Sequence, residues 1–142
     1  MSIITNSSGW FPVAVQALVV IAGTEGLCSS HTMAQDLNAH AVFVRRVLAQ
    51  LARANIVQAR EGRDGGYRLA RSAENITLAE IYRAVKQGEP QLETACSSSV
   101  NDRVQFVLDE VGTEAEQLLL ASLGQHTLAS VIERMTTSGR TS

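Results

Sequence analysis

The chain has 142 residues and a net charge of −2 at pH 7, from 12 basic and 14 acidic side chains. This length suits one domain, and a hydrophobic content of 45% with only 4% aromatic residues favours a core of packed helices. Two cysteines exclude a disulfide framework, and the apolar run at 11–22 is shorter than the roughly 20 residues that span a bilayer.

The N-terminal segment lacks the positive charges of a secretory signal, because the first basic residue is Arg45. We therefore expect a cytoplasmic protein with no membrane partner.

The basic residues are concentrated in one stretch. Residues 38–72 carry seven arginines and two acids, a net charge of +5, whereas residues 73–142 carry five basic and ten acidic residues, a net charge of −5. The seven arginines are Arg45, Arg46, Arg53, Arg60, Arg63, Arg68 and Arg71. A positive patch on an acidic protein indicates nucleic-acid binding; the alternative is a solvated charged face.

The first half of the chain has the pattern of a helix-turn-helix. An apolar helix is expected from Pro12 to Ala22, with Gly23 taking the left-handed stop. Ser29 or Ser30 can cap a short helix through Leu37, and Asn38 tolerates a left-handed turn. A third helix is predicted over about 39–54. Its apolar stripe comprises Val44, Val47, Leu48 and Leu51.

A β-hairpin follows. Val57, Ala59, Tyr67 and Leu69 alternate with polar residues on either side of a glycine-rich turn at 62–66. The expected turn residues are Gly62, Gly65, Gly66 and Tyr67. A hairpin in this position is typical of the wing of a winged helix.

The second half of the chain is predicted to be helical. Thr77 and Glu80 form a capping box for a helix that ends near Gly88. A long helix follows from 100 to about 123, and Thr127 can cap a final helix whose tail frays from Thr136. The apolar seam of the long helix comprises Val100, Val104, Val107, Leu108, Val111, Leu118 and Leu119.

These elements predict a mainly α fold with a small β-hairpin. It consists of a winged helix-turn-helix DNA-binding domain at 10–87, a loop at 88–99 and dimerisation helices at 100–135.

In such a fold the second helix of the helix-turn-helix enters the major groove. Val42 could contact a thymine methyl group, and Arg45 or Arg46 could bond guanine. His40 with Ser29 or Ser30 could hold phosphates. The wing arginines Arg60, Arg63 and Arg68 could reach phosphates or a narrow minor groove. For each arginine the alternative is phosphate contact without base reading, or solvation.

Four segments together resemble the Rrf-two family of bacterial winged-helix transcriptional regulators. They are SSHTMAQDL at 29–37, VFVRRVL at 42–48, GGYRLA at 65–70 and ITLAEIYRAV at 76–85, and the likeness extends over residues 10–132. The resemblance implies a homodimer in which the long helix at about 100–123 crosses to the partner subunit.

Family members that hold an iron-sulfur cluster carry three cysteines in the loop after the ITLAEIYRAV helix, where this chain has only Cys96. We therefore predict no cluster and no other cofactor. Cys96 is a candidate thiol sensor, against the alternative of an ordinary free cysteine, and Cys28 is expected to pack as a small hydrophobe. The three histidines show no ligand spacing, so no metal site is predicted.

The sequence predicts a sequence-specific repressor that binds double-stranded DNA as a homodimer and responds to an effector, either a small molecule or a protein. A winged-helix protein-interaction or scaffold module with an incidental basic face is the alternative. We do not expect an enzyme, because the chain has no phosphate-binding loop, nucleophile motif or paired carboxylates.

Overall fold

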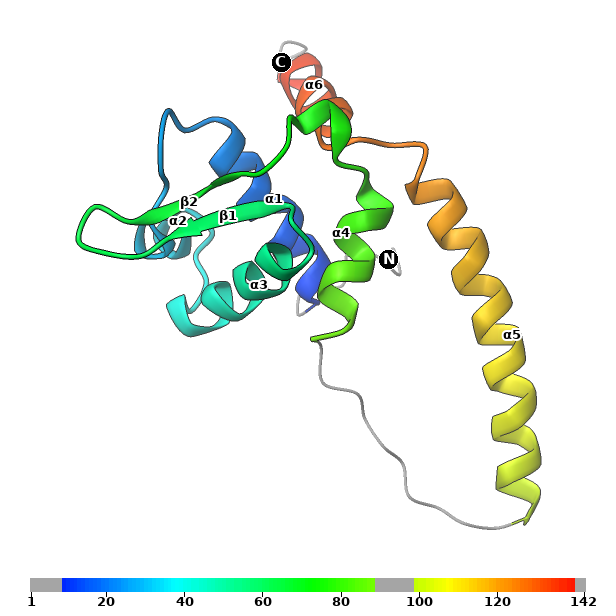
Figure 1. Ribbon diagram of the computed structural model, residues 1–142. Helices are drawn as coiled ribbons and strands as arrows, with labels where there is room; N and C mark the ends of the chain where they lie inside the picture. The colour runs from blue at the N-terminus through cyan, green and yellow to red at the C-terminus, as the bar shows by residue number, and fades with distance from the viewer. Residues whose placement is uncertain (1–8, 89–98, 140–142) are drawn as a thin grey trace.

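The computed structural model describes residues 9–88 and 99–139 (Figure 1). Within these ranges the elements are α1 (Trp10–Ala22), α2 (Ser30–Asp36), α3 (Ala41–Arg53), β1 (Val57–Arg60), β2 (Gly66–Leu69), the 3-10 turn η1 (Ala73–Asn75), α4 (Leu78–Lys86), α5 (Ser99–Leu123) and α6 (Leu128–Ser138). The predicted mainly helical fold with one small hairpin is confirmed.

The helix-turn-helix is formed by α2 and α3. Ser29 caps α2, because its hydroxyl accepts a hydrogen bond of 3.1 Å from the Thr32 backbone N–H. Asn38 turns the chain with a φ of 51°. The predicted stripe of α3 is fully buried, at 0% exposure for each of Val44, Val47, Leu48 and Leu51. This stripe holds α3 in the core and leaves its opposite side to solvent.

The boundaries of α1 differ from the prediction. The helix begins at Trp10, so that Pro12 lies inside the first turn. Proline is tolerated there because the N–H groups of the first turn have no intrahelical acceptor, and proline lacks an N–H. Gly23 does not adopt the predicted left-handed conformation: its φ is −86°, and its N–H bonds the carbonyl of Val19 at 3.1 Å. The left-handed residue comes three positions later, at Gly26 with a φ of 80°.

The hairpin pairs β1 with β2 in antiparallel register from Val57 opposite Leu69 to Arg60 opposite Gly66. Its free edge is closed by Cys28, which exchanges two backbone hydrogen bonds with Tyr67, of 2.9 and 2.8 Å. This isolated bridge was not predicted from the sequence. It ties the wing to the loop between α1 and α2.

The C-terminal helix belongs to the same core as the winged helix. Thr127 pairs with Thr77, and the N–H of Leu128 bonds the carbonyl of Ile76 at 2.8 Å. The Leu128 side chain is fully buried in the cluster that α1 and α3 also line. The predicted fraying from Thr136 is wrong, since α6 continues to Ser138 and the Thr136 hydroxyl donates to the carbonyl of Ile132.

The long helix α5 stands apart from this core. It runs unbroken through Gly112 and packs against α4 by its C-terminal half, so that most of its length projects from the domain (Figure 1). Among the described residues, no helix combines the length and the hydrophobicity needed to cross a membrane.

Candidate nucleic-acid interface

The outer face of α3 carries the side chains expected to reach the bases. Val42 is 56% exposed although it is apolar, and Arg45, Arg46 and Ala49 are exposed beside it. The Nε of Arg45 lies 3.4 Å from the carbonyl of Ala41 in the first turn. In the major groove, the guanidinium groups of Arg45 and Arg46 can bond guanine acceptors, and Val42 can contact a thymine methyl group.

A groove of about 490 Å³ lies where α2 meets the start of α3. It is lined by His31 and Gln35 of α2 and by His40, which precedes α3. The Ser29 hydroxyl is 2.8 Å from that of Thr32, so it is engaged in capping, while Ser30 is half-buried as the first residue of α2. The structure thus adds His31 and Gln35 to the predicted residues, which helical spacing on α2 alone did not single out.

Two of the three wing arginines lie on one face of the hairpin. Arg60 and Arg68 alternate away from the core together with Gln58, and Arg63 is exposed in the turn. Gln58 lies directly across from Arg68, and its Oε1 accepts a hydrogen bond of 2.9 Å from the Arg68 Nε. This contact orients the guanidinium, and its two terminal nitrogens make no hydrogen bond or ion pair to the residues that the structure describes.

The turn needs glycine for two separate reasons. Gly62 has a φ of 117°, which side chains rarely tolerate. A Cβ at Gly65 would lie 2.2 Å from the carbonyl oxygen of Arg60, and one at Gly66 would lie 2.7 Å from that of Cys28. The backbone of the wing therefore requires all three glycines. Only Gly62 and Gly65 lie in the turn, whereas Gly66 and Tyr67, also predicted there, are the first residues of β2 and pair with β1.

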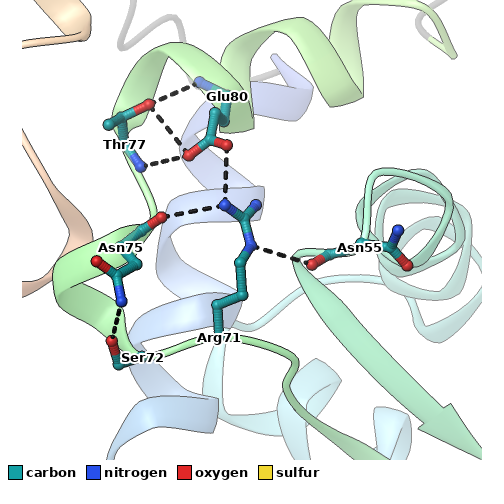
Figure 2. Close-up of polar contacts among 6 residues, drawn as sticks. All are labelled: Asn55, Arg71, Ser72, Asn75, Thr77 and Glu80. Carbon is teal, nitrogen blue, oxygen red and sulfur yellow. Dashed lines mark hydrogen bonds and ion pairs between the residues drawn. The ribbon is translucent and has the colours of Figure 1, made fainter.

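Arg71, the last arginine of the basic stretch, is used inside the protein (Figure 2). Its guanidinium bonds the carbonyl oxygens of Asn75 at 3.1 Å and Asn55 at 3.4 Å, and the Glu80 carboxylate at 2.9 Å. Arg71 joins the hairpin to α4, and the Glu80 charge offsets its own. The positive patch that remains available is smaller than the sequence count suggested.

Glu80 links this contact to the start of α4. Its carboxylate also accepts a hydrogen bond of 3.0 Å from the Thr77 N–H, completing the predicted capping box. Partial burial opposes ionisation, but the bonds from Thr77 and Arg71 outweigh it, so the pKa of Glu80 lies below its ordinary value of 4.5.

Among the described acidic residues, those of α5 lie away from α3 and the hairpin (Figure 1). In Figure 1, α5 lies on one side of α4, and α3 and the hairpin lie on the other. Five of the ten acids of the second half belong to α5: Asp102, Asp109, Glu110, Glu114 and Glu116.

A helix-turn-helix followed by a hairpin that carries arginines defines a winged-helix protein of the nucleic-acid-binding class. The model of the Rrf2 family, described as iron-dependent transcriptional regulator, matches residues 8–134. The chain belongs to this family of transcriptional regulators, the one its motifs resembled.

Relatives and solved structures match this chain over different shares of its length. The Bacillus subtilis HTH-type transcriptional regulator YwnA is 28% identical over 127 residues, covering 87% of this chain and 94% of that protein. The regulator IscR of Cereibacter sphaeroides is 37% identical over 57 residues, or 40% of this chain and 37% of IscR. Among solved structures, IscR of T. potens aligns with a TM-score of 0.66 at 25% identity, over 90% of this chain and 86% of that one. The cysteine regulator CymR of B. subtilis shares the fold, with a TM-score of 0.60 at 20% identity, over 89% of this chain and 95% of CymR.

The residues of this chain do not fit an iron-sulfur cluster. Of its two cysteines, Cys28 is buried in the core at 3% exposure, beside the wing, and Cys96 lies outside the described residues. One further thiolate per chain falls well short of the set of about four that holds such a cluster. Within 9–88 and 99–139, no three His, Cys, Asp or Glu side chains are grouped to hold a metal ion. The burial of Cys28 agrees with its predicted role as a packing residue, and the role of Cys96 stays a prediction.

Proposed function

We propose that this protein is a sequence-specific DNA-binding repressor that acts as a homodimer in the cytoplasm. The observation that carries the proposal is the exposed face of α3, where Val42, Arg45 and Arg46 lie opposite a fully buried stripe. Membership of a family of transcriptional regulators supports the same function.

In this proposal α3 contacts the DNA bases and the wing contacts the DNA phosphate backbone. Arg45 and Arg46 bond base edges, with Val42 at a thymine methyl group. His40 and the serines at 29 and 30 hold phosphates beside the helix-turn-helix. Arg60 and Arg68 on the strands of the wing and Arg63 in its turn contact phosphates or the minor groove.

The homodimer is inferred from the apolar surface of α5. Its exposed hydrophobic side chains are 52 to 69% accessible in the single chain: Val100, Val104, Phe106, Val107, Leu108, Val111 and Leu118. Spacings of four, three and four residues from Val100 to Val111 suit a seam between two helices. Leu119, also expected in the seam, is half-buried. We accordingly assign 10–87 to DNA binding and, of the helices predicted at 100–135 for dimerisation, α5 to that role, since Leu128 of α6 is buried in the core of the winged helix. The intervening loop falls mostly at 89–98, outside the described residues.

The experiment begins with the full-length protein and sheared genomic DNA. Fragments that the protein retains define an operator, and fluorescence anisotropy then compares that operator with a random duplex. Alanine at Arg60, Arg63 or Arg68 should weaken binding to both duplexes alike, whereas alanine at Arg45 or Arg46 should cost about 1–3 kcal/mol on the operator and relax preference at particular bases.

Arg134→Ala is the matched control, because it removes one exposed positive charge from α6, remote in sequence from both elements. Affinity should fall steeply with salt as counterions are released. Duplex binding that is absent or barely salt-sensitive would instead favour a protein-interaction module. Equal losses on both duplexes for the Arg45 and Arg46 variants would show that base reading lies elsewhere. A reporter gene placed behind the operator separates repression from activation.

A further inference from the structure

A second groove, lined by two arginines, lies between the end of α3 and α4. Its volume is about 320 Å³. Gln50 and Arg53 of α3 line one side, and Glu80, Arg83 and Gln87 of the α4 segment line the other. Both arginines are exposed, and within the described residues neither makes an ion pair or hydrogen bond through its guanidinium group.

The one carboxylate in the groove is already neutralised. Glu80 bonds Arg71 at 2.9 Å and the Thr77 N–H at 3.0 Å. The groove is lined by Arg53, Arg83 and Glu80, and Glu80 is paired with Arg71 outside the lining. Together these four side chains carry a net charge of about +2. The C-terminal ends of α3 and α4 repel anions, so any attraction in this groove must come from the two arginines.

The side chains of the groove have the chemistry that recognises an oxyanion. Guanidinium groups bind phosphate and carboxylate oxygens in a bidentate fork, and the amides of Gln50 and Gln87 can donate further hydrogen bonds. A Cβ at Gly88 would lie 2.6 Å from the Gln50 side chain. Gln50 is thereby held close to the backbone that follows α4.

We propose that this groove binds a small free anion carrying a phosphate or carboxylate group. The anion bridges Arg53 on α3 to Arg83 on α4. Since α3 is the helix assigned to base reading, occupancy of the groove changes DNA affinity, and DNA binding changes anion affinity by the same factor. The inference goes beyond the proposed function by giving the unidentified effector a site and a chemical class.

The test uses inorganic phosphate as the probe and the full chain without DNA. Isothermal titration calorimetry is run at constant ionic strength, with chloride replaced by phosphate. We expect saturable binding to the wild type, and a dissociation constant raised about tenfold or more by Arg53→Ala and by Arg83→Ala, because each removes a charged hydrogen-bonding partner. Arg83→Lys keeps the charge without the fork and should weaken binding less.

The control variant is Arg134→Ala, which loses the same charge from α6 and should bind phosphate as the wild type does. Phosphate also has a general stabilising effect on proteins, because it is excluded from their surface. That effect does not depend on the groove, so it would be the same in Arg53→Ala, Arg83→Ala, Arg83→Lys and Arg134→Ala. Absence of saturable binding, or identical binding in every variant, would overturn the proposal.

The DNA backbone is the other source of phosphate groups. If free phosphate does not bind and Arg83→Ala instead lowers the salt dependence of duplex binding by about one phosphate contact, the groove belongs to the DNA interface and the small-anion site is refuted. The titration itself needs no DNA. It therefore succeeds or fails independently of the proposed repressor function.

Discussion

The backbone of Gly66 touches that of Cys28 at the edge of the wing. A Cβ at Gly66 would lie 2.7 Å from the Cys28 carbonyl oxygen and 3.2 Å from its nitrogen. Both are backbone atoms of the paired strand, so they cannot rotate away as a flexible side chain could.

Gly66→Ala should therefore destabilise the protein by about 1–3 kcal/mol, as overpacking does in a tight interior. Urea unfolding measures the loss. Gly112→Ala is the control with the opposite expected sign: no atom lies within 4 Å of a Cβ there, and alanine is favoured over glycine within a helix by about 1 kcal/mol. Equal stability of the two variants would contradict the close approach.

The Glu80 carboxylate makes stability depend on acid pH. Because its pKa is lower in the folded protein than the ordinary value of 4.5, its contribution is complete above that value and is lost as the pH falls through the folded pKa. Glu80→Gln should reduce the unfolding free energy at pH 7 by about 1 kcal/mol or less, since Arg71 and Glu80 are each more than a third exposed.

The difference between wild type and Glu80→Gln should shrink below pH 4.5. Urea unfolding at several pH values measures this. Glu74→Gln, at an exposed carboxylate of η1, controls for charge alone. A difference that stays constant from pH 7 to the acid range would show that Glu80 stabilises only through its capping geometry.

Among the elements, aromatic contacts of α1 join α3 to α4, and a further side-chain contact joins α4 to α5. Trp10 packs edge-on to Phe43 of α3, and its neighbour Phe11 packs on Tyr82 of α4, both with ring centroids 5.6 Å apart. Lys86 lies 5.5 Å from the centre of the Tyr82 ring and bonds Glu116 of α5 at 2.5 Å. The first turn of α1 thus contacts α3 and α4 together.

Loss of the Lys86–Glu116 pair should loosen α5. The hydrogen bond to Glu116 outweighs partial burial and raises the pKa of Lys86 above its ordinary 10.5, so the contact is complete below pH 10.5 and is lost as the pH rises through the folded pKa. Glu116→Gln should cost about 1 kcal/mol or less, because both side chains are over a third exposed.

Backbone hydrogen exchange near the end of α5 measures this loosening. The expected result is faster exchange around Glu116 in the Glu116→Gln variant, with the core of α3 unchanged. Glu110→Gln removes a similar exposed charge from the same helix and should leave exchange near residue 116 as it is. Similar acceleration in both variants would show that the pair does not anchor the helix.

For the whole molecule, the exposed, projecting part of α5 indicates that two copies of the chain associate. Residues 101–115 are exposed without exception in the single chain. A helix of this kind has few tertiary contacts to sustain it, and isolated helices are marginal in water. A second copy that covers the apolar seam would supply the missing contacts.

Val111→Glu should therefore dissociate the homodimer, because it places a carboxylate within the seam at a desolvation cost. Sedimentation velocity at micromolar concentration measures the mass. Thr113→Glu adds the same charge almost on the opposite side of the helix, two residues away, and should leave the dimer intact. A wild type that sediments as a monomer would refute the homodimer.

The sequence by itself determined the elements and their buried faces. The stripe of α3, a cap of α2 at Ser29 or Ser30, and the Thr77–Glu80 capping box could all be predicted, because each depends on residues within a few positions of one another. The alternation that predicts the hairpin is equally local. Errors fell at ends and turns, at Gly23 and Thr136, where several conformations suit the same residues and neighbouring packing selects among them.

Only the tertiary structure decided which arginines remain available to bind an anion. Arg71 and Arg68 lie three residues apart in one basic stretch. Nevertheless, the Arg71 guanidinium bonds Glu80 and Asn75, whereas Arg68 bonds only Gln58, through its Nε, among the described residues. The backbone pairing of Cys28 with Tyr67 and the groove lined by Arg53 and Arg83 likewise join residues about 30 or more positions apart. Charge and spacing along the chain carry no information about such contacts, because they arise only when packing of the core brings distant segments together.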